Sequence, residues 1–195
     1  ENLIIDTFSL PDDAYRGRSR MAYSAVLGKS RMQEMANLVS AAGLALQSID
    51  ITEMAFRNLG LLAGAEGINL AMLRLRSSEG LVTVQSGADI YMARRIERGL
   101  ANVDDDFMAI TLEIQRSLDY FESQLGKGYL HRLLLLPLKR DSERAMQAFS
   151  SGLAVNLQRL DLRELFPGQT AAALPEQTQA YCLASVGAAL RQETD

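Results

Sequence analysis

The feature that most constrains the fold is a helix-like segment that leads into a strand apolar at every position. Apolar residues recur at helical spacing in 112–125 (LEIQRSLDYFESQL), and a glycine-containing turn follows them. The next apolar run, Leu133 to Leu136, has no polar alternation. Such a strand is buried on both faces, which requires a sheet covered by helices on both sides. The sequence therefore predicts an α/β fold.

The remaining periodicity predicts an ordered series of strands and helices. Strands are expected over 3–10, 21–27, 44–51, 68–75, 81–85, 130–136 and 153–160. Helices are expected over 29–42, 52–62, 107–125, 142–151 and 175–191. Segment 90–97 fits either a third strand of the second group or a short helix. Three antiparallel strands followed by helix, strand, helix, strand and helix is the element order of the ribonuclease H-like, actin-like core. An unrelated α/β domain fits the periodicity equally well.

Composition narrows the class of protein. The chain has 195 residues, of which 48% are hydrophobic, so it can bury a real core. Its net charge of −4 disfavours nucleic acid and anionic lipid as partners. The single cysteine, Cys182, favours a reducing, cytoplasmic compartment, and no apolar run is long enough to span a bilayer. Because the chain enters strand-like sequence directly after Glu1, we expect it to be a fragment of a longer protein, associated with membrane only through partners.

No catalytic or metal-binding set is apparent. The only histidine, His131, has no second ligand near it in sequence and is interpreted as a scaffold residue. Segment 64–71 (GAEGINLA) has glycines suited to a phosphate turn but no aspartate to hold magnesium. After the later strand, 137–140 (PLKR) stands where a nucleotide-binding fold would need two glycines. We therefore expect no bound cofactor and no catalysis.

Three charged groups have both a structural and a functional interpretation. Asp104 to Asp106 is interpreted as a helix cap. The stripe of Glu113, Arg116 and Asp119 is interpreted as a solvated helix face. The cluster of Arg94, Arg95 and Arg98 fits either a solvated face or a site where a partner protein docks. These three arginines are the candidate partner-binding residues.

Four blocks of sequence carry a resemblance to a known family. They are 1–11 (ENLIIDTFSLP), 49–59 (IDITEMAFRNL), 87–100 (GADIYMARRIERGL) and 112–125 (LEIQRSLDYFESQL). In this order and spacing they resemble the MshI family of MSHA pilus biogenesis proteins. That family belongs with the PilM-like, actin-like components of type IV pilus machines. The resemblance implies an actin-like fold and a place on a bacterial inner-membrane assembly platform.

The resemblance also implies a division of the chain. Residues 1–51 would be a small α+β subdomain inserted in the first lobe, 52–63 a linking helix of that lobe, and 64–195 the complete second lobe. PilM relatives bind nucleotide and grip the cytoplasmic tail of a membrane partner. The two turns discussed above depart from PilM, so nucleotide binding is not carried over, whereas tail binding is.

Several functions follow as expectations. The first is a non-catalytic cytoplasmic adaptor that binds the tail of an inner-membrane pilus protein and the motor ATPase. Self-association as a homodimer is a further expectation. The alternative is an actin-like ATPase whose nucleotide ligands lie partly in a missing N-terminal region. An unrelated α/β ligand-binding domain is the third.

Overall fold

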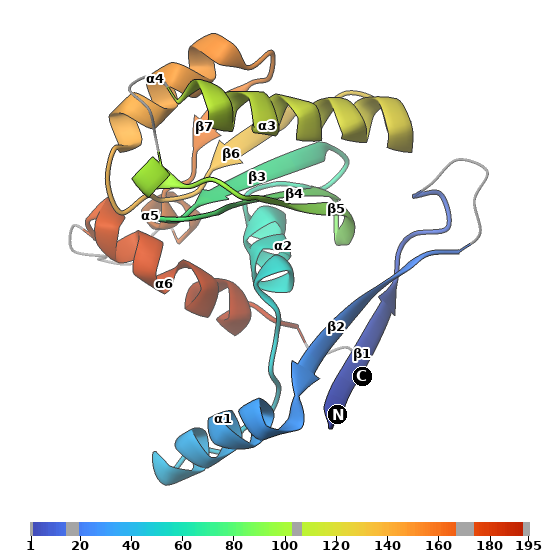
Figure 1. Cartoon of the computed structure of the whole chain (residues 1–195), viewed down its shortest axis with the longest axis vertical. Coiled ribbons are helices and arrows are strands. Elements are labelled where there is room, and N and C mark those ends of the chain that lie inside the picture. The colour runs from blue at the N-terminus through green and yellow to red at the C-terminus, as the bar shows by residue number, and fades with distance from the viewer. Residues whose placement is uncertain (1, 15–19, 103–106, 167–173, 193–195) are drawn as a thin grey trace.

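The protein consists of two parts with different layering (Figure 1). The computed structural model describes residues 2–14, 20–102, 107–166 and 174–192. The larger part, here called the lobe, is a five-stranded sheet with helices on both faces and begins at Thr52. The smaller part, here called the hairpin unit, comprises residues 2–41 and stands beside the lobe.

The bounds of the elements are as follows. The hairpin unit contains β1 (Leu3–Ser9), β2 (Ala22–Gly28) and α1 (Lys29–Ala41). The strands of the lobe are β3 (Asn69–Leu75), β4 (Gly80–Ser86), β5 (Asp89–Ile96), β6 (Arg132–Leu135) and β7 (Leu157–Arg159). Its α-helices are α2 (Thr52–Leu62), α3 (Met108–Tyr120), α4 (Ser142–Gly152), α5 (Leu162–Leu165) and α6 (Glu176–Ala189). A π-helical turn, Phe121–Leu125, extends α3.

The order of the strands in the lobe is β5-β4-β3-β6-β7. Strand β4 runs antiparallel to β3 and β5, while β6 runs parallel to β3 and β7. Segment 90–97, for which the sequence left two interpretations, is therefore a strand. An antiparallel meander continued by two parallel strands is the arrangement of the ribonuclease H-like, actin-like core that the element order indicated.

The apolar strand β6 divides its side chains between two cores. Leu133 and Leu135 pack with α3 and α4 in one cluster, which includes Ile114 and Phe149. Leu134 and Leu136 pack on the opposite face, in the cluster that contains residues of α2 and α6. Because successive side chains of a strand point to opposite faces, a sheet between two helical layers buries all of them. The predicted two-sided burial is confirmed.

Helices α2 and α6 cross closely on one face of the sheet. Gly187 lies at the crossing, where a Cβ would collide with the backbone carbonyl of Ala55. The buried Asn58 donates from Nδ2 to the Gly187 carbonyl oxygen at 2.9 Å, so the crossing also satisfies a polar group. Helix α2, which was expected to be a linking helix, thus packs on this sheet. The proposed division at residues 51 and 63 stays a prediction.

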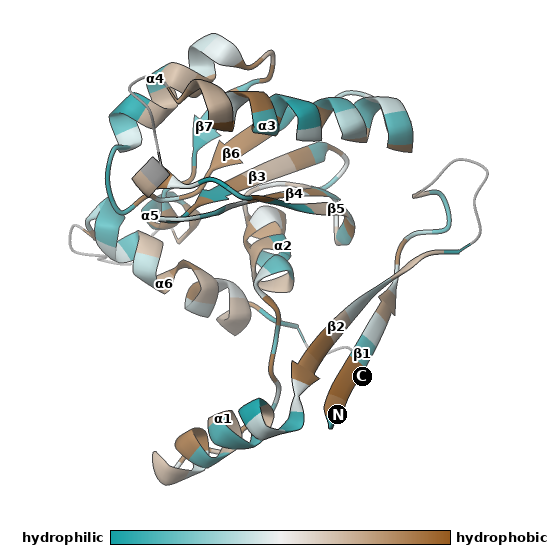
Figure 2. Ribbon diagram, in the orientation of Figure 1, coloured by the Kyte–Doolittle hydropathy of each residue, from teal (hydrophilic) through white to brown (hydrophobic). Residues whose placement is uncertain are grey.

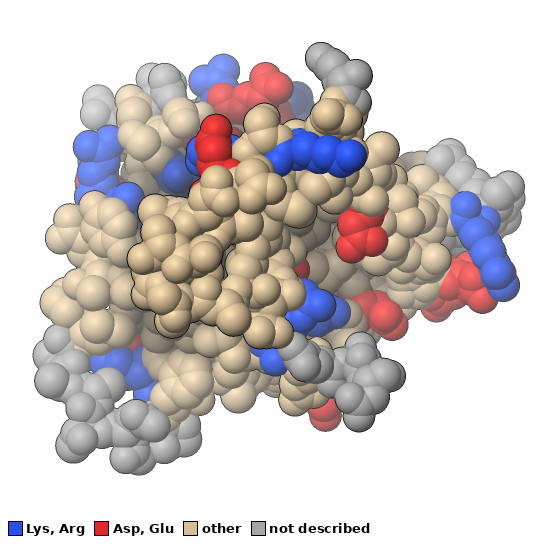
Figure 3. All heavy atoms as spheres, turned by 90° about the horizontal axis from the view of Figure 1, so that it is seen from below, with Lys and Arg blue, Asp and Glu red and all other residues tan. Residues whose placement is uncertain are grey.

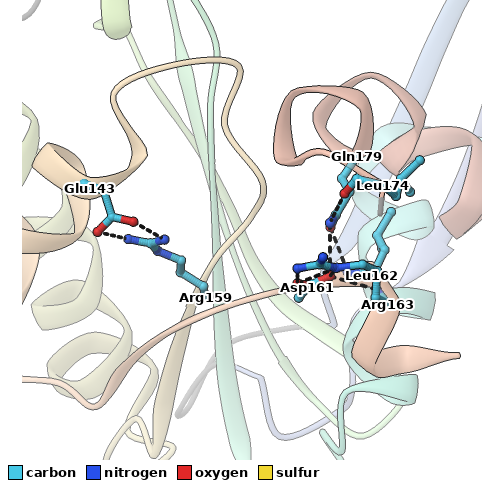
Figure 4. A network of polar contacts seen from close by, with 7 residues as sticks. All are labelled: Glu143, Arg159, Asp161, Leu162, Arg163, Leu174 and Gln179. Atoms are coloured by element: carbon cyan, nitrogen blue, oxygen red, sulfur yellow. Dashed lines mark hydrogen bonds and ion pairs between the residues drawn. The ribbon is translucent and has the colours of Figure 1, made fainter. Parts of the chain in front are cut away.

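A polar network fixes α5 and α6 at the end of β7 (Figure 4). Asp161 caps α5 by accepting from the Arg163 amide at 2.9 Å. Gln179 of α6 donates to Asp161 and accepts from the Leu162 amide. Hydrogen bonding by Arg163 lowers the pKa of Asp161 to about 2. These polar residues therefore have a structural role.

Two expectations on secondary structure were wrong. Segment 44–51 is not a strand but an irregular connection, with Leu44 66% exposed. A strand needs a neighbour that pairs its backbone groups, and no described strand lies beside this segment. The strand expected over 153–160 is limited to β7, and the short helix α5 was not predicted. The predicted cap at Asp104 to Asp106 lies outside the described residues.

Candidate functional site

A groove of about 790 Å³ lies between the hairpin unit and the lobe. Most of the side chains that line it are apolar. From the hairpin unit these include Ile4, Phe8, Tyr23, Leu27, Met32 and Met35, and from the lobe Met54, Leu81, Ile90 and Ala93. Flexible methionine side chains adapt to partners of different shape. The groove is therefore suited to holding an apolar segment.

The pairing of β1 with β2 determines which hairpin side chains face the groove. Phe8 and Tyr23 are opposite each other in the ladder, and their ring centroids lie 5.4 Å apart. The Tyr23 hydroxyl accepts a hydrogen bond from the Ala93 amide of the edge strand β5 at 3.2 Å. Burial raises the pKa of Tyr23. Tyr23 thus joins the wall of the groove to the edge of the main sheet.

The opposite face of the hairpin is exposed. Leu3 and Ile5 are 45% and 61% exposed, and Ile5 pairs directly with Val26, which is 55% exposed and also borders the groove. Helix α1 has no buried residue at all, and its Leu38 is 74% exposed. The ribbon coloured by hydropathy shows apolar residues at the start of β1 and toward the end of β2 (Figure 2). The hairpin unit therefore exposes far more apolar surface than a helix and hairpin of the core would.

Charged residues also line the groove. Arg191 pairs with Asp50 at 3.6 Å, and Glu53 lies at the start of α2. The guanidinium of Arg57 donates to Asn58 Oδ1 at 2.8 Å. Seen from the side of α1, the molecule presents a broad area with few charged side chains, and the charges lie around it (Figure 3). The groove thus combines a mostly apolar lining with several charged residues.

The first of the two turns considered for phosphate, residues 64–71, is held by hydrogen bonds within the protein. Ala65 is fully buried, and its carbonyl oxygen accepts from the Gly87 amide at 3.0 Å. Asn69 donates from Nδ2 to the backbone oxygens of Lys127 and Tyr129, at 2.8 and 3.1 Å. The Asn69 amide nitrogen in turn donates to Nδ1 of His131 at 3.2 Å. His131 and Asn69 are therefore part of the scaffold.

The second turn, residues 137–140, is already bound by a carboxylate of the protein itself. Glu176, at the start of α6, accepts through Oε1 from the Leu138 amide at 3.0 Å and from the Ser142 hydroxyl at 2.6 Å. Leu138 is buried, and Lys139 lies over the ring of Tyr181 at 3.8 Å. The turn after β6 is thus closed against α6 by a carboxylate and a cation–π contact.

The three candidate arginines differ in their ion-pair partners. Arg94 reaches toward Glu113 of α3 at 3.9 Å, and Arg95 reaches toward Glu79 at 3.5 Å. Arg98 makes no ion pair with the residues that the structure describes. The three arginines border a surface hollow of about 620 Å³, and Arg95 also lines the groove. The partner-binding role assigned to them stays a prediction.

The stripe of Glu113, Arg116 and Asp119 makes contacts along its own helix, α3. Arg116 pairs with Glu113 at 2.7 Å, and Gln115 donates to Asp119 at 2.6 Å.

Cys182 is a half-buried residue of α6. Within the described ranges, no three His, Cys, Asp or Glu side chains lie close enough together to hold a metal ion. None of the described helices is long and apolar enough to cross a membrane.

Comparison with known proteins relates this geometry to a fold. No known protein family matches the sequence, and no curated protein is significantly similar. A solved structure of a PilM–PilN type IV pilus biogenesis complex is similar over 95% of this chain, with a TM-score of 0.64 and 17% identity. The chain has an actin-like fold. It spans 66% of the length of that PilM–PilN chain.

A second solved structure is more distant. It is a protein of unknown function from Bacteroides thetaiotaomicron with an actin-like ATPase fold. Its TM-score is 0.47 and its identity 12%, and the match covers 81% of this chain and 55% of the other.

Sequence reasoning missed the groove. Met32 and Met35 recur at helical spacing, which predicted a helix but not a role for its methionines in a groove. The signal that could have indicated otherwise is the number of polar residues around them, since 29–41 (KSRMQEMANLVSA) has a weak apolar stripe. The partners of Tyr23 and Glu176 lie far away in sequence and left no local signal.

Proposed function

We propose that this chain acts in type IV pilus assembly as a protein-binding adaptor of the MshI type. The observation that carries the proposal is the likeness to the PilM–PilN complex over 95% of the chain, combined with the open apolar groove between the hairpin unit and the lobe. The groove would hold a segment of a pilus protein anchored in the inner membrane. On this proposal the chain works in the cytoplasm and reaches the membrane through that partner.

The chemistry of the groove supports a peptide ligand. A segment with apolar side chains would contact Met32 and Met35, and its charged ends would meet the ionic groups near Asp50. Grooves lined by apolar side chains, with few polar groups to orient the ligand, are typical peptide and ligand sites. The flexible methionines would let the groove close around the segment.

The first experiment measures binding to this groove. A synthetic peptide covering the cytoplasmic tail of the host's inner-membrane pilus protein is titrated into the chain by calorimetry. Met35→Glu places a charge in the groove and should weaken binding by about tenfold or more. Leu38→Glu is the matched control, because Leu38 lies on the same helix but is not part of the groove lining.

We further propose that the adaptor is non-catalytic. The support is that the Leu138 amide and the Ser142 hydroxyl are occupied by Glu176, and that the side-chain amide of Asn69 is engaged with backbone oxygens. Groups already hydrogen-bonded within the fold are not available to a phosphate without the loss of those bonds. Titration of the full-length protein with MgATP tests this, and micromolar affinity would overturn it.

A second surface is proposed for the motor ATPase. Arg94, Arg95 and Arg98 supply charge for an acidic partner at the hollow that they border. The double charge reversal Arg94→Glu and Arg98→Glu, which leaves the groove residue Arg95 unchanged, should abolish recovery of the motor ATPase in a pull-down while leaving peptide binding in place. Arg116→Glu, on the neighbouring helix face, is the control. Equal recovery with the double variant and with wild type would remove this surface from the proposal.

A further inference from the structure

The loop that follows β1 packs against the core of the lobe. Leu10 and Ala14 are 7% and 1% exposed and belong to the core cluster of the lobe. Between them, Asp13 pairs through Oδ2 with Nζ of Lys127. Among the residues that the structure describes, this is the only ion pair that joins the hairpin unit to the lobe.

Lys127 is held in an unusual environment for a lysine. Its side chain is only 13% exposed, and Nζ lies 4.6 Å from the centroid of the Tyr91 ring. The Tyr91 hydroxyl donates to Asp13 Oδ1 at 3.4 Å, so all three side chains are in mutual contact. Gly126 and Gly128 flank Lys127 with φ of 61° and 83°, a tight turn that an L-residue would adopt only with strain. The turn presents Lys127 to the loop of the hairpin.

We propose that Asp13, Lys127 and Tyr91 form a latch that fixes one end of the hairpin on the lobe and so sets the opening of the groove. The inference rests on the proposed function in one respect, since it assigns regulation to the groove where the partner would bind. The three residues come from three separate elements, the β1–β2 loop, the turn before β6, and β5. The rest of the hairpin unit meets the lobe mainly across the groove and through the Tyr23–Ala93 hydrogen bond.

The environment of Lys127 favours the closed latch. The Asp13 side chain is 73% exposed, but that of Lys127 is only 13% exposed, so removing the carboxylate leaves a largely buried lysine against the Tyr91 ring, which is costly because a buried charge needs a counter-charge. Loss of the pair would loosen the loop on the lobe, where Leu10 and Ala14 still anchor it. Hydrogen bonding by Lys127 lowers the pKa of Asp13, and burial raises the pKa of Tyr91 to about 12, so the ionised carboxylate and the neutral phenol are the partners of Lys127 near neutral pH.

The latch is tested by a distance measurement that needs no ligand. Spin labels are placed on exposed residues by Ser40→Cys in α1 and Gln147→Cys in α4, in a Cys182→Ala background. Asp13→Asn and Lys127→Met should each broaden and shift the distance distribution toward longer values. Amide exchange in β1 and β2 should accelerate by about tenfold, while exchange in β3 and β6 stays unchanged and shows that the lobe is folded.

Controls separate the latch from general loop effects. Asp12→Asn removes a similarly exposed carboxylate from the same loop, but its partner Arg20 is 87% exposed whereas Lys127 is 13% exposed, so distances and exchange should match wild type. Lys127→Arg keeps the cation and should retain most of the wild-type distribution. Wild-type distances and exchange in both Asp13→Asn and Lys127→Met would overturn the latch.

Peptide titration distinguishes the latch from the proposed function. If the peptide does not bind the wild type, the proposed function fails while the label distances still decide the latch. If it does bind, Asp13→Asn should change its affinity, whereas Asp12→Asn should not. An affinity unchanged by Asp13→Asn would show that the hairpin position does not control the groove.

Discussion

The lobe and the hairpin unit have similar local secondary structure but very different burial. Strand β6 has Leu133 at 0% exposure, whereas Ile5 of β1 is 61% exposed. Helix α3 buries Ile110, Ile114 and Leu118, whereas α1 buries nothing. A helix of 13 residues without tertiary packing is marginal in water. The lobe is therefore the source of stability, and the hairpin unit is the part available to a partner.

The test with the largest expected effect truncates one apolar side chain to alanine in each of the two parts. Phe121→Ala creates a cavity in a fully buried site and should lower the free energy of unfolding by about 3–5 kcal/mol. Leu38→Ala should change it by less than about 0.5 kcal/mol, because Leu38 is exposed and alanine favours helix. Urea unfolding of both variants measures the difference. Similar losses would show that the hairpin unit is as well packed as the lobe.

A smaller effect is expected from the carboxylate that closes the turn after β6. Glu176→Ala leaves the Leu138 amide without its partner and should destabilise the lobe by about 1–3 kcal/mol. Glu164→Ala, an exposed residue of α5, is the control and should have little effect. Thermal unfolding with and without MgATP measures both variants. A gain of nucleotide binding in Glu176→Ala would indicate that the turn is a masked phosphate site.

Acid should weaken the lobe through Asp161. Its pKa is lowered from 3.8 to about 2 in the folded protein, chiefly by hydrogen bonding from Arg163. A lowered carboxyl pKa stabilises the fold above the unfolded value, and this contribution is lost as pH falls from about 4 through about 2. Asp161→Asn should therefore cost about 1 kcal/mol at pH 6, allowing for solvent around Arg163, and almost nothing at pH 2. Urea unfolding at several pH values measures the difference, and a constant gap would contradict the assignment.

The smallest effect expected is concentration-dependent self-association through the outward face of the hairpin. Apolar side chains on this face would be covered if two copies met, which is the basis of the predicted homodimer. Ile5→Glu should reduce association measured by light scattering. Leu112→Glu, at a half-exposed position of the lobe, is the matched control. A strict monomer at high concentration would remove the prediction.

Much of the lobe could be predicted because its sequence patterns are local and strong. The run from Leu133 to Leu136 indicated burial on both faces, and the periodicity of 112–125 indicated the helix that covers one of them. Segment 44–51 was wrongly predicted as a strand because its residue types suit a strand, while pairing depends on a neighbour elsewhere in the chain. The candidate site was predicted least well, since its chemistry was sought in arginines and phosphate turns rather than in Met32 and Tyr23.

The sequence by itself determined most of the order of the elements in the lobe and the two-sided burial of its central strand, and it indicated an actin-like arrangement. These properties depend on periodicity, which is a relation between near neighbours in the chain. Only the tertiary structure decided where the hairpin lies, that Glu176 occupies the Leu138 turn and that Lys127 meets Asp13. Such contacts join residues far apart in sequence, and they depend on how the layers pack, which no local pattern specifies.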